Sequence, residues 1–385
     1  MIKYLGSKRR LVPTLAAMAT SVGGSSHSSR PSALDLFSGT ARVAMALKHA
    51  GMRVTAVDSA TYAHVLAETY VATDACLVDI EELAEVLASL DRLPGRAGYV
   101  TDVFCEQSRY FHPDNGRRID AIRDAIEEDW AASPLYSVLL TSLLEAADRV
   151  DSTTGLQMAY LKQWAPRALR PLELRVPALV AGPGEAVLGD ASVLAGTLGA
   201  YDLAYLDPPY NQHRYFGNYH VWETLVRWDA PEHYGVACKR VDCRDDETAS
   251  RFNRRRDMPV ALASVIAEVD SSLLLVSYNN ESWLSAEDLV GMCRERLERR
   301  SVVSSDPAVA ILGLDQPRYV GARIGIHNPA GEKVGTVSHV RNTELIVAAG
   351  PTDLVRRAVE AGLVAAAASG LSASEVPVAA AMLLD

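Results

Sequence analysis

The sequence lacks the features of a membrane-spanning, metal-binding or disulfide-stabilised protein. A transmembrane helix takes about 20 consecutive apolar residues, and no run in the 385-residue chain approaches that length. The five cysteines form no CxxC pair and the nine histidines show no metal-ligand spacing, so no metal is predicted. The N-terminus has no signal-peptide architecture. We therefore expect a protein of the reducing cytoplasm without a membrane partner.

An excess of positive charge is also lacking, since the 38 Lys and Arg residues are outnumbered by 48 Asp and Glu residues and the net charge is −10. This argues mildly against a nucleic-acid partner without excluding one, because local basic patches rather than the total charge determine phosphate binding. Hydrophobic residues make up 49% of the chain, which is enough to bury a large core, and the length predicts two domains. A GxGxxG dinucleotide fingerprint is missing too, because Gly39 has no glycine partner at the required spacing.

What is present is an alternation of strands and helices, which predicts an α/β fold with a doubly wound, mostly parallel sheet. The expected strands are short apolar runs at residues 33–37, 54–57, 186–188, 201–206 and 273–277. Residues 80–181 lose this rhythm and predict a helical insertion, with helical periodicity at residues 119–130 and 136–147. Near the end, residues 322–327 and 337–348 predict a hairpin.

One aspartate lies within the first expected strand and another directly follows the second. Asp35 precedes a Ser-Gly-Thr turn, where Gly39 lets the backbone approach a ligand at an electropositive helix N-terminus. Asp58 ends the next strand, where nucleotide-binding folds place a ribose-binding acid. Taken alone, the Ser-Gly-Thr turn is equally well explained as a structural loop. Asp58, taken alone, is equally well explained as the N-cap of the following helix. Together they favour an adenosine ligand with an amino group, because a carboxylate repels phosphate but suits ammonium. S-adenosylmethionine fits this description.

The stretch Asp207-Pro208-Pro209-Tyr210 follows another expected strand directly. Prolines cannot donate to a sheet, so the strand stops there and leaves the carboxylate at the ligand-binding edge. The exocyclic amine of a base is a poor nucleophile, because its lone pair is delocalised into the ring. A carboxylate at Asp207 and the rigid carbonyl of Pro208 would accept its two N–H groups and localise the lone pair, while Tyr210 stacks on an extruded base. The plain alternative is a strand-ending turn.

These motifs carry a close resemblance to a known family. "DPPY" together with "DLFSGT" resembles the amino-group DNA methyltransferases, and the acid in the first position favours adenine N6 over cytosine N4. "IKYLGSKRRL", residues 2–11, is similar to the N-terminal motif of the Dam-like adenine methylases. Longer pieces, "DPPYNQHRYFGNYHVWETL", "DRVDSTTGLQMAYLKQW" and "VSHVRNTELIV", resemble the FokI-type modification methylases.

The resemblance implies a set of site residues. The cofactor would be bound by Tyr4, Gly6 and Lys8 of the N-terminal motif, by Asp35, Phe37 and Gly39 around its methionine part, by Asp58 at its ribose and by Asp190 at its adenine. Catalysis would fall to Asp207, Pro208 and Tyr210, and substrate binding to Pro209, Asn211 and Tyr215. One departure is Ala41, where the family has a glycine, and its methyl group is expected to crowd the cofactor slightly. Of the aromatic residues that follow, we expect Tyr215 in the pocket and Trp222 in the core.

We therefore predict an S-adenosylmethionine-dependent DNA adenine-N6 methyltransferase. Residues 1–79 and 182–350 would form the catalytic domain, residues 80–181 a target-recognition insertion, and residues 351–385 an alanine-rich helical tail. Double-stranded DNA would be the substrate, with a cognate restriction endonuclease as a further partner. Two alternatives remain open: the same chemistry on RNA, and a catalytically idle nucleic-acid-binding module. The intact Asp207–Tyr210 stretch argues against idleness.

Overall fold

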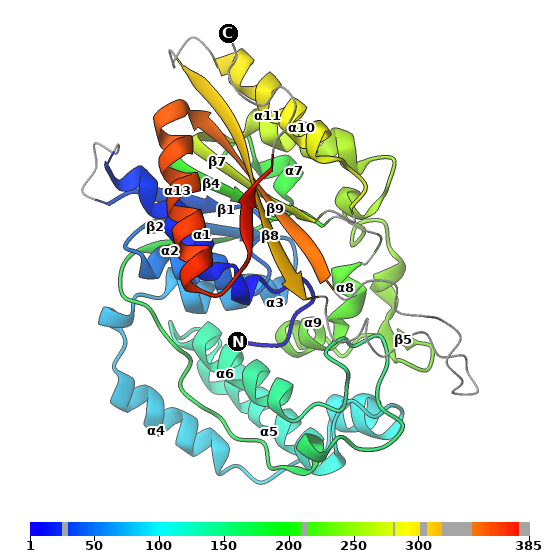
Figure 1. Ribbon diagram of the computed structural model, residues 1–385. Coiled ribbons are helices and arrows are strands. Elements are labelled where there is room, and N and C mark those ends of the chain that lie inside the picture. Colours follow the sequence, from blue (N-terminus) through cyan, green and yellow to red (C-terminus); the bar gives the residue numbers. More distant parts are fainter. Residues whose placement is uncertain are drawn as a thin grey trace.

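A computed structural model describes residues 1–24, 30–209, 212, 214–279, 282–300, 306–317 and 341–376. Within these residues one mixed sheet has the strand order β10-β8-β9-β7-β4-β1-β2-β3 (Figure 1). The strands are β1 (Ser32–Asp35), β2 (Arg53–Asp58), β3 (Gly184–Leu188), β4 (Ala200–Leu206), β7 (Asp270–Asn279), β8 (Pro307–Pro317), β9 (Arg341–Pro351) and β10 (Ala373–Glu375). The strands from β3 to β7 run parallel, and β9, β8 and β10 are antiparallel to their neighbours. The doubly wound, mostly parallel sheet is confirmed.

Helices cover both faces of this sheet (Figure 1). Along β4, Leu203 and Tyr205 enter one hydrophobic core while Ala204 and Leu206 enter the other, because successive strand residues point to opposite faces. The first core takes in residues of α1 (Val12–Thr20), α2 (Arg42–His49), α3 (Thr61–Ala67) and α13 (Thr352–Ala368). The second takes in α7 (Ala191–Leu194), α10 (Met258–Glu268) and α11 (Ala286–Arg300). This two-sided burial explains why the parallel strands are nearly continuous apolar runs.

The insertion is helical, as predicted, and forms a lobe at one side of the sheet (Figure 1). Its elements are α4 (Ile80–Asp91), the π-helix η5 (Val100–Glu106), α5 (Pro113–Trp130), α6 (Tyr136–Arg149) and the 3-10 turn η6 (Pro166–Leu169). The lobe shares the first hydrophobic core instead of having a separate one. On its inner side, Thr141 of α6 lies 2.8 Å from the hydroxyl of Thr69, and Glu145 accepts a hydrogen bond from Tyr70 at 2.6 Å. The insertion is thus part of the fold's main body.

The segment of the chain that follows β4 completes this lobe. It contains α8 (Tyr215–Asn218), α9 (His220–Arg227), β5 (His233–Tyr234) and β6 (Lys239–Arg240). Arg123 of α5 donates to the backbone oxygens of Leu225 and Val226 at 2.7 and 3.0 Å. Tyr99 donates to the backbone oxygen of Pro231 at 2.6 Å. The lobe therefore combines the expected insertion with chain that the sequence had assigned to the catalytic domain.

The C-terminal strands differ from the sequence-based prediction. β9 pairs on one side with β7 and on the other with β8, whereas residues 322–327, its expected hairpin partner, lie outside the described residues. The helix expected in the tail is α13, and the short strand β10 that follows it was not foreseen. The remaining turns are η1 (Lys8–Arg10), η2 (Ser21–Gly24), η3 (Glu68–Ala72), η4 (Ala75–Leu77), η7 (Val241–Arg244) and η8 (Arg251–Asn253). No helix in the described chain is long and apolar enough to span a membrane.

Candidate active site

A cavity of about 390 Å³ opens where the parallel strands end. Every predicted site residue that lies among the described residues lines this cavity, namely Tyr4, Gly6, Lys8, Asp35, Phe37, Gly39, Asp58, Asp190, Asp207, Pro208, Pro209 and Tyr215. Tyr210 and Asn211 lie outside the described residues. The convergence follows from topology, because parallel strands share one carboxyl edge and the loops after them meet there.

Asp35, the last residue of β1, is a buried acid with an unsatisfied oxygen. The backbone N–H of Ala44 donates to Oδ2 at 3.1 Å, but Oδ1 has no hydrogen-bond partner among the described residues. Burial, followed by the charge of Asp207, raises the pKa of Asp35 to about 8. Ser38 also lines the cavity, and its buried hydroxyl likewise has no hydrogen-bond partner among the described residues. Unpaired buried polar atoms are costly, so this end of the cavity fits a ligand carrying a cation and a hydrogen-bonding group.

Two features disfavour a side chain at Gly39. Its φ is +52°, and a Cβ built on it would lie 3.2 Å from the ring of Tyr4. Ala41, two residues later, also has a left-handed backbone with φ 57°, which explains why a glycine is favoured there. Ala41 is fully buried and does not line the cavity. The departure at this position therefore strains the backbone and does not crowd the ligand space.

Asp58 and Asp190 sit on the neighbouring strand ends. Asp58 accepts the backbone N–H of Gly39 at 2.8 Å on Oδ2 and that of Ala60 at 2.9 Å on Oδ1, which shapes both turns around the cavity. Each carboxylate oxygen keeps a second lone pair for a ligand. Asp190 caps α7 through Oδ1, which accepts from the backbone and hydroxyl of Ser192. Within the described part of the chain its Oδ2 accepts no hydrogen bond, so it too can meet a ligand.

Tyr4 of the N-terminal motif contacts three other tyrosines beside the cavity, namely Tyr62, Tyr215 and Tyr219. The ring of Tyr4 stacks on Tyr219 with centroids 4.6 Å apart and on Tyr215 with centroids 5.3 Å apart. The backbone N–H of Leu5 donates to the hydroxyl of Tyr219 at 2.5 Å, and the hydroxyls of Tyr4 and Tyr62 lie 3.2 Å apart. Tyr215 lines the cavity and Trp222 is 2% exposed. The pocket interpretation for Tyr215 and the core interpretation for Trp222 agree with these positions.

Asp207 is held by an ion pair that the sequence did not predict. Lys8 places its Nζ 2.8 Å from Oδ1 of Asp207 and 2.8 Å from Oε1 of Glu344 on β9. The resemblance assigned Lys8 to cofactor binding as part of the N-terminal motif. In the structure, Lys8 instead forms an ion pair with the carboxylate of Asp207. Burial raises the pKa of Asp207 to about 6, against the lowering effect of Lys8 and with a raising contribution from Glu344. Asp207 is thus a largely ionised acceptor at neutral pH.

Two parts of the site were missed by sequence reasoning. Glu344 follows no strand end, and only the pairing of β9 with β7 brings it near Asp207. Residues 247–250, 252 and 253 line the opposite wall of the cavity, where Phe252 packs edge-to-face on Phe37 with centroids 5.0 Å apart. This wall carries no strand or helix signal, and the spacing of Phe252 from the motifs gives no hint of its position. Across the described residues, no cluster of His, Cys, Asp or Glu is placed to bind a metal ion.

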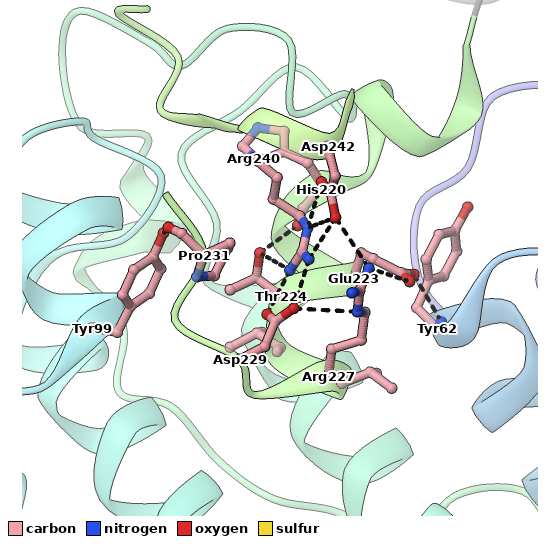
Figure 2. A network of polar contacts seen from close by, with 12 residues as sticks. Tyr62, Tyr99, His220, Glu223, Thr224, Arg227, Asp229, Pro231, Arg240 and Asp242 are labelled. Atoms are coloured by element: carbon pink, nitrogen blue, oxygen red, sulfur yellow. Dashed lines mark hydrogen bonds and ion pairs between the residues drawn. The ribbon is translucent and has the colours of Figure 1, made fainter. Parts of the chain in front are cut away.

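A buried arginine lies within a network of polar contacts in the lobe (Figure 2). Arg240 on β6 is 1% exposed and binds Asp229 through two hydrogen bonds of 2.7 Å, while Asp242 accepts a further one at 2.8 Å. Arg227 lies 3.1 Å from Asp242 and 4.0 Å from Glu223.

On the far side of this network, Glu223 accepts the backbone N–H of Tyr62 at 3.2 Å. Tyr62 lines the cavity and contacts Tyr4 through its hydroxyl. A continuous set of polar contacts therefore runs from the β5–β6 hairpin through α9 to the N-terminal motif.

Comparison with known proteins gives consistent matches. The model of the D12 class N6 adenine-specific DNA methyltransferases matches residues 4–292. The chain is 33% identical over 309 residues to Type II methyltransferase M.NlaIII of Neisseria lactamica. The aligned region covers 77% of this chain and 88% of that protein. It is 29% identical over 310 residues to Modification methylase StsI of Streptococcus sanguinis, covering 76% of this chain and 46% of the relative. Type II methyltransferase M.FokI of Planomicrobium okeanokoites is 32% identical over 199 residues, covering 48% of this chain and 29% of the relative.

Proposed function

The chain belongs to the D12 class N6 adenine-specific DNA methyltransferases, and on this premise we propose that it takes the methyl group from S-adenosylmethionine and uses Asp207 and Pro208 to activate the target amine. The observation that carries the proposal is the convergence of the predicted residues on one cavity, with the carboxylate of Asp207 at one end and the unsatisfied Oδ1 of Asp35 at the other.

The cavity supports S-adenosylmethionine as the methyl donor. A volume of about 390 Å³ falls in the range of small-molecule sites. Asp35 would bind the ammonium group of the cofactor, Asp58 its ribose hydroxyls and Asp190 its adenine amine. Gly39, which lacks a side chain, leaves the backbone of the first turn open to it. When bound, the cofactor supplies a methyl group made electrophilic by the positively charged sulfur to which it is attached.

The residues at the end of β4 support the activation of the adenine N6. Asp207 lines the cavity with its side chain 20% exposed, so a base that leaves the duplex can reach it. Its carboxylate accepts one N–H of the amine and the backbone oxygen of Pro208 accepts the other, which draws the nitrogen toward tetrahedral geometry. Carboxylate charge then stabilises the positive charge that develops on nitrogen. Tyr210 and Tyr215 would provide stacking surfaces for the extruded base, with Pro209 and Asn211 beside it.

We extend the proposal to the DNA that is recognised. Double-stranded DNA would lie against the lobe formed by residues 80–181 and the segment from α9 to β6. The contacts between these two parts support their acting together in recognising the target sequence. The names of the relatives, type II methyltransferase and modification methylase, support a cognate restriction endonuclease that cuts the same sequence when it is unmodified.

Single-turnover methylation of duplex DNA tests the role of Asp207. Asp207→Ala should lower the rate of methyl transfer by about 10²–10³, because one well-aimed polar group in the transition state is lost. The affinities for the cofactor and for DNA should remain close to those of the wild-type protein. Asp353→Ala, an exposed aspartate on α13 whose side chain is 82% exposed, serves as the control. If Asp207→Ala methylated DNA as fast as this control, the proposed role would be wrong.

A further inference from the structure

Glu344 belongs to a buried cluster of charges directly behind the reacting end of the cavity. Its Oε1 accepts from Nζ of Lys8 at 2.8 Å and from the hydroxyl of Ser277 at 2.9 Å. Lys8 in turn is bound to Oδ1 of Asp207. The side chains of Lys8 and Glu344 are 6% and 10% exposed, against 20% for Asp207. Glu344 therefore faces Lys8 from the side away from the opening.

Exposure and position separate the roles of the three residues. Asp207 and Lys8 line the cavity, whereas Glu344 does not. Glu344 also lies on β9, beyond residues 4–292 that match the family model. Any influence of Glu344 on the reaction must pass through Lys8 and Asp207, because its carboxylate does not reach the space where a base or a cofactor would lie.

Charge balance shows what this influence is. Lys8 fixes Oδ1 of Asp207 and so orients the carboxylate, while Oδ2 accepts no hydrogen bond among the described residues. A lone ammonium group at 2.8 Å would also neutralise Asp207 and weaken it as an acceptor. Glu344 supplies a second negative charge to the same ammonium group, so the cluster keeps one net negative charge. That charge is needed when the amine nitrogen becomes positive during methyl transfer.

The geometry points to Glu344 as a positioning residue that holds Lys8 in place across Asp207 and offsets its charge, so that Asp207 is fixed in orientation yet remains a strong acceptor for the target amine. This inference rests on the proposed role of Asp207. The other titratable groups facing Asp207 are Asp35 at the end of β1 and Tyr205 within β4. Neither contributes a positive charge, so Lys8 is the cation whose effect Glu344 offsets within the described residues.

The test is Glu344→Gln, which keeps the shape of the side chain and removes its charge. Single-turnover methyl transfer should slow by about tenfold to a hundredfold, the range found for side chains that orient a metal ligand and so act in a comparable indirect way. The acidic limb of the pH–rate profile should also move to lower pH, because Glu344 is one of the groups that raise the pKa of Asp207. A residue with only a structural role would lower the rate without moving that limb.

A second variant keeps the test decisive if the rate falls for other reasons. Lys8→Met leaves two carboxylates facing one another, so the acidic limb should move to higher pH. In the double variant Lys8→Met with Glu344→Gln this repulsion is gone, and the combined loss of rate should be smaller than the product of the two single losses. Independent, multiplicative losses would overturn the inference, as would an unchanged rate and pH profile in Glu344→Gln.

Controls separate this inference from the proposed function. Glu185→Gln makes the same chemical change at an exposed position on β3 of the same sheet and should methylate at the normal rate. If Asp207→Ala is inactive while Glu344→Gln behaves like Glu185→Gln, only the inference about Glu344 is wrong. If Asp207→Ala remains active, the proposed role of Asp207 fails first, and the inference fails with it.

Discussion

The proposed place of the cofactor's ammonium group beside Asp35 predicts that cofactor binding releases a proton. Burial raises the pKa of Asp35 to about 8 in the free protein, so this carboxyl group is mostly protonated at pH 6.5. A ligand ammonium group beside the unsatisfied Oδ1 favours the ionised form. Binding at pH 6.5 should therefore release close to one proton for each cofactor bound.

Titration calorimetry measures this release directly. S-adenosylhomocysteine, which carries the same amino-acid group and no transferable methyl, is titrated in two buffers of different ionisation enthalpy. The difference between the two apparent binding enthalpies gives the number of protons released. In Asp35→Asn the release should vanish, because the amide does not titrate. Affinity should fall by about tenfold to a hundredfold, since a hydrogen bond to a charged group contributes about 1.5–3 kcal/mol.

Stability provides an independent check that Asp35→Asn acts locally. A carboxyl group whose pKa is higher in the folded than in the unfolded chain binds more protons when folded, between the unfolded pKa near 4 and the folded pKa of about 8. The free energy of unfolding of the unmodified protein should therefore fall across this window as pH rises. Asp35→Asn removes this contribution, so its melting temperature should rise relative to the unmodified protein between pH 5 and 8. A buffer-independent binding enthalpy at pH 6.5, or a flat difference in melting temperature, would refute the reasoning.

Three further substitutions test the backbone and the polar network. Ala41→Gly should raise the free energy of unfolding by about 1 kcal/mol in urea titrations, because it relieves a left-handed backbone, and should leave cofactor affinity unchanged. Gly39→Ala should weaken cofactor binding at least tenfold by calorimetry, since the new Cβ meets the ring of Tyr4; normal affinity would contradict the fit described for this turn. Arg240→Met should lower the free energy of unfolding by about 3 kcal/mol, and adding Asp229→Asn should recover part of that loss in the same denaturation assay.

The acids of the site could be predicted from the sequence because each follows a strand. Asp35, Asp58 and Asp207 stand directly after apolar runs whose length and composition indicate buried parallel strands. In such a sheet the ends of neighbouring strands meet at one edge, so local pattern alone implies that the three carboxylates converge. Asp190 also follows β3, after one glycine, but its place in the site was predicted from the resemblance to the family and not from the strand pattern.

The position of Glu344 beside Lys8 could not be predicted in this way. It lies inside a strand, and its position depends on the antiparallel pairing of β9 with both β7 and β8. Residues 308–314 form an apolar run of strand length that carried a signal for β8. The pairing of β8 with β9 depends on contacts across the sheet, and periodicity along one strand does not report them.

The extent of the insertion could not be predicted either, since helical periodicity marks residues 80–181 but not the segment that packs against them. The contacts of Arg123 and Tyr99 with the backbone of that segment are specific to the folded chain. Because α6 also shares the core of the sheet, replacing the insertion between relatives requires that its inner face be kept. A simple deletion would expose that core.

The position of β9 between β7 and β8 gives the enzyme an order of assembly. During synthesis Lys8 emerges first, Asp207 later and Glu344 after both, so the cavity residues contributed by β1, β2 and β4 are available before β9 has been made. Pairing between distant segments is a slow part of folding, and β9 must enter the sheet before Glu344 reaches Lys8. A nascent chain can therefore bring together the cavity residues of β1, β2 and β4 before Lys8 and Asp207 have Glu344 beside them.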